Sequence, residues 1–456
     1  MPRPQNGAPT LRSPNDHGVA VTGAGAGHGT LATGERERTV VPRILLRAHK
    51  DPFRVVSPEE TLRSNLIGDN SGNLLFSHAA YKMLRTRDTS ITTSTMQTGK
   101  LDAARINAEY DAVVLPLANA FRPSFERHLN AISAVIEKLT IPVTVLGVGA
   151  QLRLDGATDR LDGMRASTER FVRAVLERSP SIGVRGEFTR DYLHGLGFKQ
   201  VEMIGCPSLF LNGADLRVEK RAERITRNSR ISMNLSPYVE GIAPFVERHV
   251  RRYPNMHYIA QNKDALSMLL APRRHTLVEP EQKTLPVHSG HPLVAGHRTR
   301  FFVDAQPWLD YLSTFDFSFG TRIHGNIAGL ASGVPSYVLA HDSRTHDLAR
   351  YFDIPHRTMV HVDGLTDAAD LYAEADYTAF NAGHRERFDR FTAFLGDHGL
   401  GHVFEAGEDP AAFDRQVAAL RFPEAVGGRR GLLPKRSVLR RLPVIARRPL
   451  RSPIAV

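Results

Sequence analysis

An arginine and a histidine two positions apart, Arg322 and His324, are the residues of this sequence best suited to chemistry. An apolar run precedes them and small residues follow, which predicts a strand that ends at Gly320 and a helix that begins near Asn326. Because Ile323 separates the two side chains, both can point to one side of the connecting loop. A guanidinium binds carboxylate or phosphate in bidentate geometry, and an imidazole transfers protons near neutral pH. The pair therefore predicts an anionic substrate, held at a helix start, whose reaction needs a proton.

A purely structural role is the alternative for this pair. Arg322 would then cap a backbone carbonyl, and His324 would be a buried histidine with satisfied hydrogen bonds. The strand, loop and helix around the two residues favour the functional interpretation, because ligands of α/β proteins bind beyond the carboxyl ends of strands.

Two series of strands alternating with helices must position these side chains. The apolar segments of the first series are 112–115, 143–149, 181–185 and 201–204, and those of the second are 230–235, 257–260, 300–303, 315–319 and 336–339. Helical spacing between them, as in 125–139, indicates parallel sheets covered on both faces. The predicted fold class is α/β, with two Rossmann-like, doubly wound domains facing a cleft.

Composition sets the expected domain boundaries. The predicted parts are a disordered leader at 1–40, an N-terminal domain at 41–215, a C-terminal domain at 228–405, a closing helix at 406–420 and a basic, disordered tail at 421–456. A polar, arginine-rich stretch separates the two domains.

The positive charge is concentrated at the C-terminal end. The whole chain carries a net charge of +11, and the tail contributes nearly all of it. The rest of the chain therefore lacks the excess of basic residues that is typical of nucleic-acid-binding proteins. Prolines in the tail argue against a long helix there. The tail is expected to be either a solvated extension or a contact with anionic lipid at the inner face of a membrane.

The single cysteine, Cys206, allows no internal disulfide and suits a reducing compartment. No apolar stretch is long enough for a membrane helix, and the N-terminus has no signal-peptide core. These features predict a cytoplasmic protein. Cys206 itself is expected to be a small packed residue, although a thiol could in principle add to an enolpyruvyl group.

Three motifs give the chain a family resemblance. Arg322-Ile323-His324-Gly325, with its small-residue helix and the Gly-Val-Pro that follows, resembles the C-terminal signature of the polysaccharide pyruvyl transferases. The polar turn and helix start at 342–348 extend this match. The segment 183–197 resembles the family's strand-ending arginine and helix, and 68–74 resembles its first loop.

The resemblance implies a transferase that moves a pyruvyl group from phosphoenolpyruvate onto sugar hydroxyls, in exopolysaccharide biosynthesis of the cell envelope. It also implies a fold like that of the B-type glycosyltransferases, with an acceptor-side N-terminal and a donor-side C-terminal domain. Arg185, Arg322, His324 and the backbone of Ile323 would hold phosphoenolpyruvate, and His324 would be the catalytic general acid. No cofactor and no metal are expected, because no ligand cluster is recognisable in the sequence.

Polar residues after the N-terminal strands are the acceptor-binding candidates, because amides and carboxylates suit the hydroxyls of a sugar. These candidates are Asp69, Asn70, Asn73, Asn119 and Gln151. Bonding to their own loops is the alternative for each of them. In the C-terminal half, Asn234, Ser236, Gln261 and Asn262 are further candidates.

Two other functions fit the same architecture. One is a nucleotide-sugar-dependent glycosyltransferase, in which the basic loop would bind a diphosphate. The other is a non-catalytic carbohydrate-binding protein. The partners expected for the leading hypothesis are phosphoenolpyruvate and a glycan or glycolipid acceptor, without nucleic acid.

Overall fold

The computed structural model describes residues 42–96, 102–152, 154, 157–274 and 282–427. The described residues form one compact unit. The predicted leader lies outside the described residues, as does the tail from residue 428 onward.

The first half of the chain builds a four-stranded parallel sheet in the order β2-β1-β3-β4 and a parallel pair, β5-β6. A bridge between Val148 and Val184 joins the pair to the end of β4. The elements are β1 (Arg43–Arg47), α1 (Pro58–Arg63), α2 (Gly72–Leu84), β2 (Ser90–Ser94), α3 (Ala103–Glu109), β3 (Ala112–Pro116), α4 (Glu126–Ile136), β4 (Val143–Leu146), α5 (Arg165–Leu176), β5 (Ile182–Val184), α6 (Glu187–Gly195) and β6 (Val201–Met203).

The second half builds a six-stranded parallel sheet in the order β12-β11-β10-β7-β8-β9. Its elements are β7 (Ile231–Asn234), α7 (Ile242–Arg252), β8 (His257–Ala260), α8 (Lys263–Leu270), α9 (Pro292–Ala295), β9 (Thr299–Phe301), α10 (Ala305–Leu312), β10 (Phe317–Gly320), α11 (Ile323–Ala331), β11 (Ser336–Ala340), α12 (Ser343–Tyr351) and β12 (His356–Thr358).

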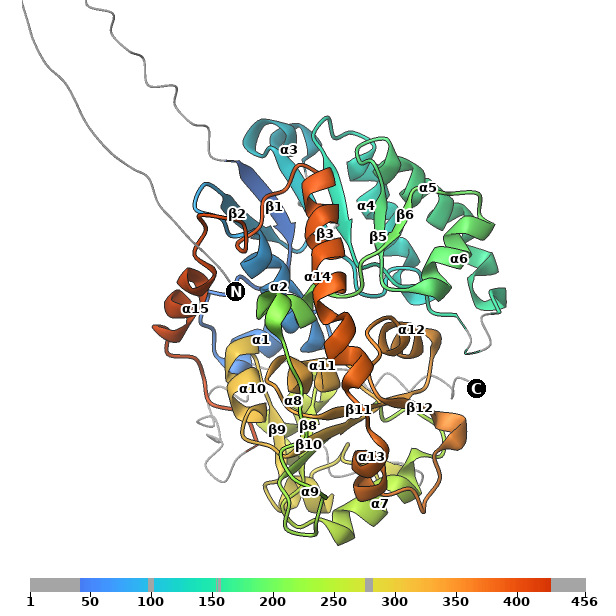
Figure 1. Cartoon of the computed structure of the whole chain (residues 1–456), viewed down its shortest axis with the longest axis vertical. Coiled ribbons are helices and arrows are strands. Elements are labelled where there is room, and N and C mark those ends of the chain that lie inside the picture. The colour runs from blue at the N-terminus through green and yellow to red at the C-terminus, as the bar shows by residue number, and fades with distance from the viewer. Residues whose placement is uncertain (1–41, 97–101, 153, 155–156, 275–281, 428–456) are drawn as a thin grey trace, which may run out of the picture. The chain divides into compact units, whose positions relative to one another are not determined.

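Helices lie over the sheets (Figure 1), which explains the composition of the strands. Every residue of β4, β7, β10 and β11 is buried. Strands covered on both faces are continuous apolar runs instead of alternating patterns. The predicted α/β class and the parallel sheets are confirmed.

Each sheet reverses its strand order at one place. In the six-stranded sheet, the chain starts at β7, builds outward to β8 and β9, and then returns to place β10 on the other side of β7. In the four-stranded sheet, β1 lies between β2 and β3 in the same way. Ligands of open α/β sheets bind at such switch points, outside the carboxyl ends of the strands.

Three helices follow the second sheet: α13 (Ala368–Glu374), α14 (Thr378–Asp397) and α15 (Pro410–Ala418). The long α14 packs Phe388 and Phe391 against Phe210, and His398 at its end bonds the carbonyl of Ser181. This helix was not predicted from the sequence.

The predicted closing helix is α15, and it packs on α2. Its Phe413 contacts the rings of Tyr81 and His78. The chain stays packed beyond residue 421, the predicted start of the tail, because Val426 pairs with Phe301 at the edge of the six-stranded sheet.

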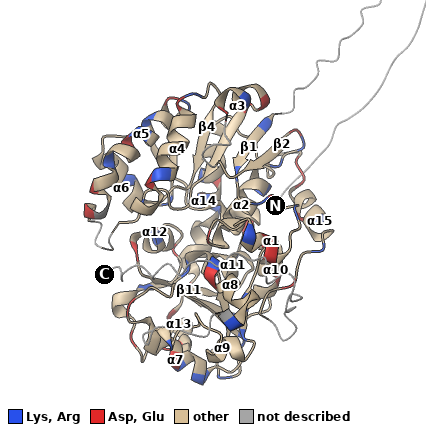
Figure 2. Cartoon of the chain, turned by 180° about the vertical axis from the view of Figure 1, so that it is seen from behind, with Lys and Arg blue, Asp and Glu red and all other residues tan. Residues whose placement is uncertain are grey.

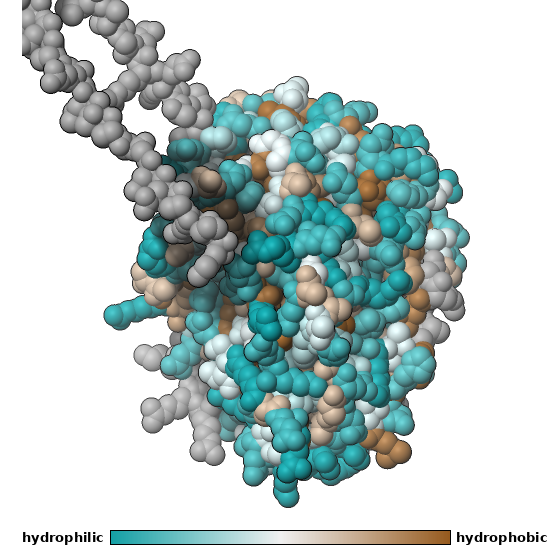
Figure 3. Space-filling view, viewed as in Figure 1, coloured by the Kyte–Doolittle hydropathy of each residue, from teal (hydrophilic) through white to brown (hydrophobic). Residues whose placement is uncertain are grey.

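Lys, Arg, Asp and Glu are interspersed over the helices (Figure 2), and hydrophilic side chains predominate on the face shown in Figure 3. None of the helices within the described ranges is long and apolar enough to cross a membrane.

Candidate active site

Arg322 lies at the switch point of the six-stranded sheet, between the ends of β7 and β10. It caps α11, and its backbone N–H donates to Oδ1 of Asn234 at 2.8 Å. Its guanidinium donates through Nε to the carbonyl of Leu235 at 3.1 Å and through Nη2 to Oδ1 of Asn262. The ring of Tyr238 lies 5.6 Å from its Cζ. These contacts hold the guanidinium at the carboxyl edge of the sheet.

A buried amide network fixes the turn between β10 and α11. Nδ2 of Asn234 donates to Oδ1 of Asn326 at 2.9 Å, and Nδ2 of Asn326 donates to the carbonyl of Gly320 at 2.9 Å. Gly320 has a φ of 138°, and a Cβ there would lie 1.9 Å from the carbonyl oxygen of Asn234. Only glycine fits this position.

His324 lies in the first turn of α11, because the helix begins at Ile323 and not near Asn326 as predicted. The side chain is buried, with 9% exposed. Its ring stacks on Phe76 of α2 at 6.3 Å, and its Nε2 lies 3.9 Å from Sγ of Cys206. Arg322, at the cap, is half-buried, so it is more exposed than His324.

Arg185 follows β5 and is 1% exposed. Its Nε donates to the carbonyl of Gly147 at 3.0 Å, and its Cζ lies 5.5 Å from the ring of Phe76. The same phenyl ring therefore supports both Arg185 and His324. Its buried Nη2 has no hydrogen-bond partner among the residues that the structure describes. An unsatisfied buried N–H is costly, which favours a ligand at this atom.

Arg344, in the first turn of α12, joins this group although it was not among the predicted site residues. Its Nε donates to Oδ2 of Asp342 at 2.9 Å. With the amide of Asn119 turned so that its oxygen faces the arginines, Nη1 of Arg344 donates to it at 2.9 Å. The signal in the sequence was positional: Arg344 begins a helix after β11, as Arg322 does after the neighbouring β10.

Positive charge predominates among these side chains. Burial, and then the charges of Arg185, Arg344 and Arg322, hold the pKa of His324 well below its usual value. Burial also lowers the pKa of Arg185 to about 10. Within the described residues, neither Arg185 nor Arg322 has a carboxylate at ion-pair distance, whereas Arg344 is paired with Asp342. The arrangement is suited to an anion with more than one charged group.

The acceptor candidates of the first loop bond mainly to the loop itself. Oδ1 of Asp69 accepts from Asn65, Oδ1 of Asn70 accepts from the N–H of Gly72, and Nδ2 of Asn73 donates to the carbonyls of Ile67 and Gly68. Asn70 also bridges to Asn262, so this loop lies beside the end of β8.

Asn119 and Gln151 lie nearer to the arginines. The amide oxygen of Asn119 also accepts from Nη1 of Arg122 at 2.8 Å, and Gln151 lies beside it. Of the candidates in the second half, Asn234 and Asn262 hold Arg322, and the N–H of Ser236 bonds the hydroxyl of Thr321.

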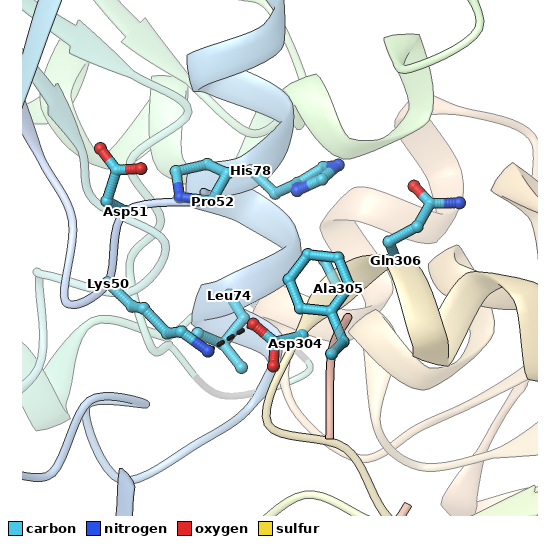
Figure 4. Close-up of a pocket in the computed structure, with 9 residues that line it drawn as sticks. Lys50, Asp51, Pro52, Leu74, His78, Asp304, Ala305 and Gln306 are labelled. Atoms are coloured by element: carbon cyan, nitrogen blue, oxygen red, sulfur yellow. Dashed lines mark hydrogen bonds and ion pairs between the residues drawn. The ribbon is translucent and has the colours of Figure 1, made fainter. Parts of the chain in front are cut away.

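A small pocket has none of these residues in its lining (Figure 4). It is lined by Lys50, Asp51, Pro52, Leu74, His78, Asp304, Ala305, Gln306 and Phe422. Lys50 points at Asp304 and donates to its Oδ1, which joins the segment after β1 to the segment after β9. No group of three or more metal-ligating side chains occurs within the part of the chain that the structure describes.

Residues 70–343 match the sequence profile of the family described as polysaccharide pyruvyl transferase. This match covers more than half of the chain, so the chain belongs to the polysaccharide pyruvyl transferase family. The predicted resemblance is confirmed, and the chain is assigned to a family of transferases. No curated protein matches the chain at a significant level.

Three solved structures resemble the chain at low identity. One is the UDP-GlcNAc 2-epimerase of Methanocaldococcus jannaschii in complex with UDP-GlcNAc and UDP, with 11% identity, coverage of 78% of this chain and 99% of that chain, and a TM-score of 0.40. Another is the HepE protein of Anabaena in complex with UDP and glucose, with 11% identity, coverage of 83% and 98%, and a TM-score of 0.39. A functionally uncharacterised protein of Klebsiella pneumoniae has 11% identity, coverage of 69% and 89%, and a TM-score of 0.37.

Proposed function

We propose that the chain transfers the pyruvyl group of phosphoenolpyruvate onto two hydroxyls of a sugar in a polysaccharide or glycan precursor, and so forms a pyruvate ketal. Membership of the family supports pyruvyl transfer. The observation that carries the donor assignment is that the unpaired, buried Arg185 and the buried His324 lie against the same ring, that of Phe76, while Arg322 caps the helix that carries His324. Phosphoenolpyruvate has a carboxylate and a phosphate, which together supply the negative charge that this group lacks.

In this proposal the arginines bind the donor and His324 acts on it. The unpaired Nη2 of Arg185 and the guanidinium of Arg322 bind the carboxylate and phosphate oxygens, and Arg344 adds charge beside them. The backbone N–H of Ile323, at the start of α11, has no partner within the helix and would bind the same anion.

The reaction adds a proton to C3 of phosphoenolpyruvate and displaces the phosphate group from C2. Protonation of C3 of the enol by His324 gives an oxocarbenium-like C2, which a sugar hydroxyl attacks as it loses its proton. The bond between C2 and the phosphate oxygen then breaks, and a second hydroxyl closes the ketal. His324 gives its proton to the new methyl group and takes up the proton of the first hydroxyl, so the ring is regenerated. The departing hydrogen phosphate carries the proton of the second hydroxyl. The arginines stabilise the phosphate as it leaves.

The acceptor is proposed to lie on the side of Asn119 and Gln151, because Asn119 adjoins Arg344 at the edge of the donor group and Gln151 lies beside Asn119. Asp69, Asn70 and Asn73 would shape the neighbouring loop. The single cysteine, Cys206, supports a reducing, cytoplasmic setting for the reaction.

Ligand-induced stabilisation combined with phosphate release tests the proposal. Phosphoenolpyruvate should raise the melting temperature, and phosphate should be released when a panel of sugar acceptors is added. The His324→Ala variant should still be stabilised by phosphoenolpyruvate, but should lose roughly 10²–10⁴ in turnover, the usual contribution of a general acid. His361→Ala, at an exposed position of the same half, is the matched control and should remain active.

The other outcomes decide between functions. Stabilisation by nucleotide sugars in place of phosphoenolpyruvate would show a glycosyltransferase. Stabilisation by free sugars alone would show a carbohydrate-binding protein. A fully active His324→Ala variant would remove His324 from the chemistry.

A further inference from the structure

Two arginines lie at the switch point of the four-stranded sheet, between β1 and β3. Arg47 is the last residue of β1, and Arg122 follows β3. This is the place where an open α/β sheet binds its ligand, just as the switch between β7 and β10 holds Arg322. The proposed donor site lies at the switch point of the six-stranded sheet. The switch point of the four-stranded sheet has no function in that proposal.

Arg47 is held in place but is not neutralised. Its Nη1 donates to the carbonyl of Pro116 at 3.2 Å, and its Cζ lies 5.9 Å from the ring of Phe125. Its Nε is buried and has no hydrogen-bond partner within the described part of the chain. Burial lowers the pKa of Arg47 to about 10.

Arg122 lies against the same ring, with its Cζ 5.4 Å from the centre of Phe125. Its Nε donates to Oγ of Ser124 at 3.0 Å, and its Nη1 donates to the carbonyl of Asn119 at 3.0 Å. Burial lowers its pKa to about 10, and the charges of Arg344 and Arg47 act in the same direction. Phe125 therefore brings two guanidinium groups to one place.

Negative charge is missing around these two arginines. Across the described residues, neither Arg47 nor Arg122 has a carboxylate at ion-pair distance, although the same sheet pairs Arg43 with Asp111 at 2.9 Å. The negative charge of Asp69 acts on Arg122 and His49. Asp69 is exposed, however, and its carboxylate accepts a hydrogen bond from Asn65 instead of pairing with an arginine. Two half-buried cations without a counter-ion are costly unless an anion binds them.

A row of polar contacts connects this place with the donor site. The amide oxygen of Asn119 accepts from both Arg122 and Arg344, at 2.8 and 2.9 Å. Arg344 in turn acts on His324. The arginines at the first switch point therefore continue the cationic edge of the donor site toward Asn119 and Gln151, the residues proposed for the acceptor side.

We propose that Arg47 and Arg122 form a second oxyanion subsite, which binds a phosphate or carboxylate group carried by the acceptor sugar. The inference rests on the proposed function, because it names the class of acceptor for that reaction. The guanidinium groups would orient the acceptor by its charged group, so that its hydroxyls face the donor.

Titration of the donor-saturated protein tests the subsite. With phosphoenolpyruvate at saturation, the melting temperature is followed while a hexose 1-phosphate, a hexuronic acid or the neutral hexose is added. Either or both charged sugars should stabilise wild type, and which one does so identifies phosphate or carboxylate as the recognised group. Arg47→Gln and Arg122→Gln should each weaken that binding by about tenfold or more, the value of a lost charge-assisted hydrogen bond.

Matched variants separate charge from structure. Arg47→Lys and Arg122→Lys keep the positive charge and should retain most of the binding. Arg105→Gln removes an exposed arginine of α3 and should behave as wild type. The melting temperature without ligand reports whether each variant folds, and the affinity for phosphoenolpyruvate should remain within a few-fold of wild type.

Three results would overturn the subsite. In the first, no charged sugar binds the donor-saturated wild type. In the second, the glutamine variants bind the charged sugars as well as wild type does. In the third, they lose phosphoenolpyruvate affinity in parallel, which would assign both arginines to the donor. A wild-type protein that does not bind phosphoenolpyruvate at all would contradict the proposed function instead.

Discussion

Gly72, the first residue of α2, lies directly against the imidazole of His324. A Cβ at position 72 would lie 2.8 Å from Nδ1 of His324 and 2.9 Å from its Cβ. Such distances do not occur between real side chains, so the position of His324 depends on the absence of a side chain at residue 72. The contact joins the first loop of the sequence to the Arg-Ile-His-Gly motif, far along the chain.

Replacing Gly72 by alanine should displace His324 without breaking the fold. The added methyl group must push the ring away from Phe76 and the arginines, and misplacement by about 1 Å can cost about 10²-fold in rate. Steady-state phosphate release and the melting temperature together measure this effect. Gly195→Ala, where a Cβ meets nothing within 4 Å, is the control. Equal turnover in the two variants would contradict the proposed role of His324.

The arginines should contribute unequally to donor binding. Arg185 is buried and unpaired, whereas Arg344 is already paired with Asp342. We expect Arg185→Gln to weaken phosphoenolpyruvate binding more than Arg344→Gln does, by roughly the 1.5–3 kcal/mol of a hydrogen bond to a charged group. Calorimetric titration measures both constants. The reverse order would mean that Arg344 is the main ligand of the donor.

The protonation of His324 should depend on the donor. In the protein without ligand, burial and three arginines depress the pKa of His324, so the ring is neutral at pH 7 and cannot act as an acid. If the proposed donor binds here, its negative charge should offset those charges and raise this pKa. Binding should therefore take up protons, to a limit of about one per site, and affinity should increase as pH falls through the pKa of the complex toward the lower pKa of the free protein.

Calorimetry in buffers with different ionisation enthalpies measures this uptake. The donor phosphate itself titrates near pH 6, so the informative quantity is the difference between wild type and His324→Gln. The variant should take up fewer protons. Identical uptake in both proteins would show that His324 stays neutral in the complex.

The strands that carry the site were predictable because they are buried on both faces. Runs such as 143–146 and 317–320 are almost wholly apolar, and the Arg322 and His324 pair follows one of them. Edge strands lack this signal: β2 reads Ser-Ile-Thr-Thr-Ser and has a single buried residue. The helix α14 was missed since its buried phenylalanines are diluted by charged residues over 20 positions.

The remaining site residues have at most a positional signal in the sequence, because topology brings them together. Arg344 reaches the site only since β11 lies beside β10. Arg47 and Arg122 are 75 positions apart in the sequence, and the pairing of β1 with β3 places them on opposite sides of one switch point. Neither has a motif of its own. The boundary of α11 was misjudged because Arg322, instead of a small polar residue, occupies its cap.

The ion pair between Lys50 and Asp304 should contribute to the stability of the protein and not to its activity. Their side chains are 2% and 5% exposed, and burial raises the pKa of Asp304 to about 6 despite the pull of Lys50. Lys50→Met leaves the carboxylate buried without a cation, which typically costs about 3–5 kcal/mol. Because the folded-state pKa of Asp304 lies above its unfolded value, the folded protein binds more protons between about pH 4 and 6. The loss should therefore be largest above pH 6 and should shrink as pH falls.

Urea unfolding of Lys50→Met at pH 8 and pH 5.5 measures this loss and its pH dependence. Adding Asp304→Asn to the same variant removes the unpaired charge and should recover much of the stability. Arg105→Gln breaks an exposed pair with Glu109 and should leave the unfolding midpoint nearly unchanged at both pH values. A Lys50→Met loss that is equal at the two pH values would show that lost packing, and not the buried carboxylate, destabilises the variant.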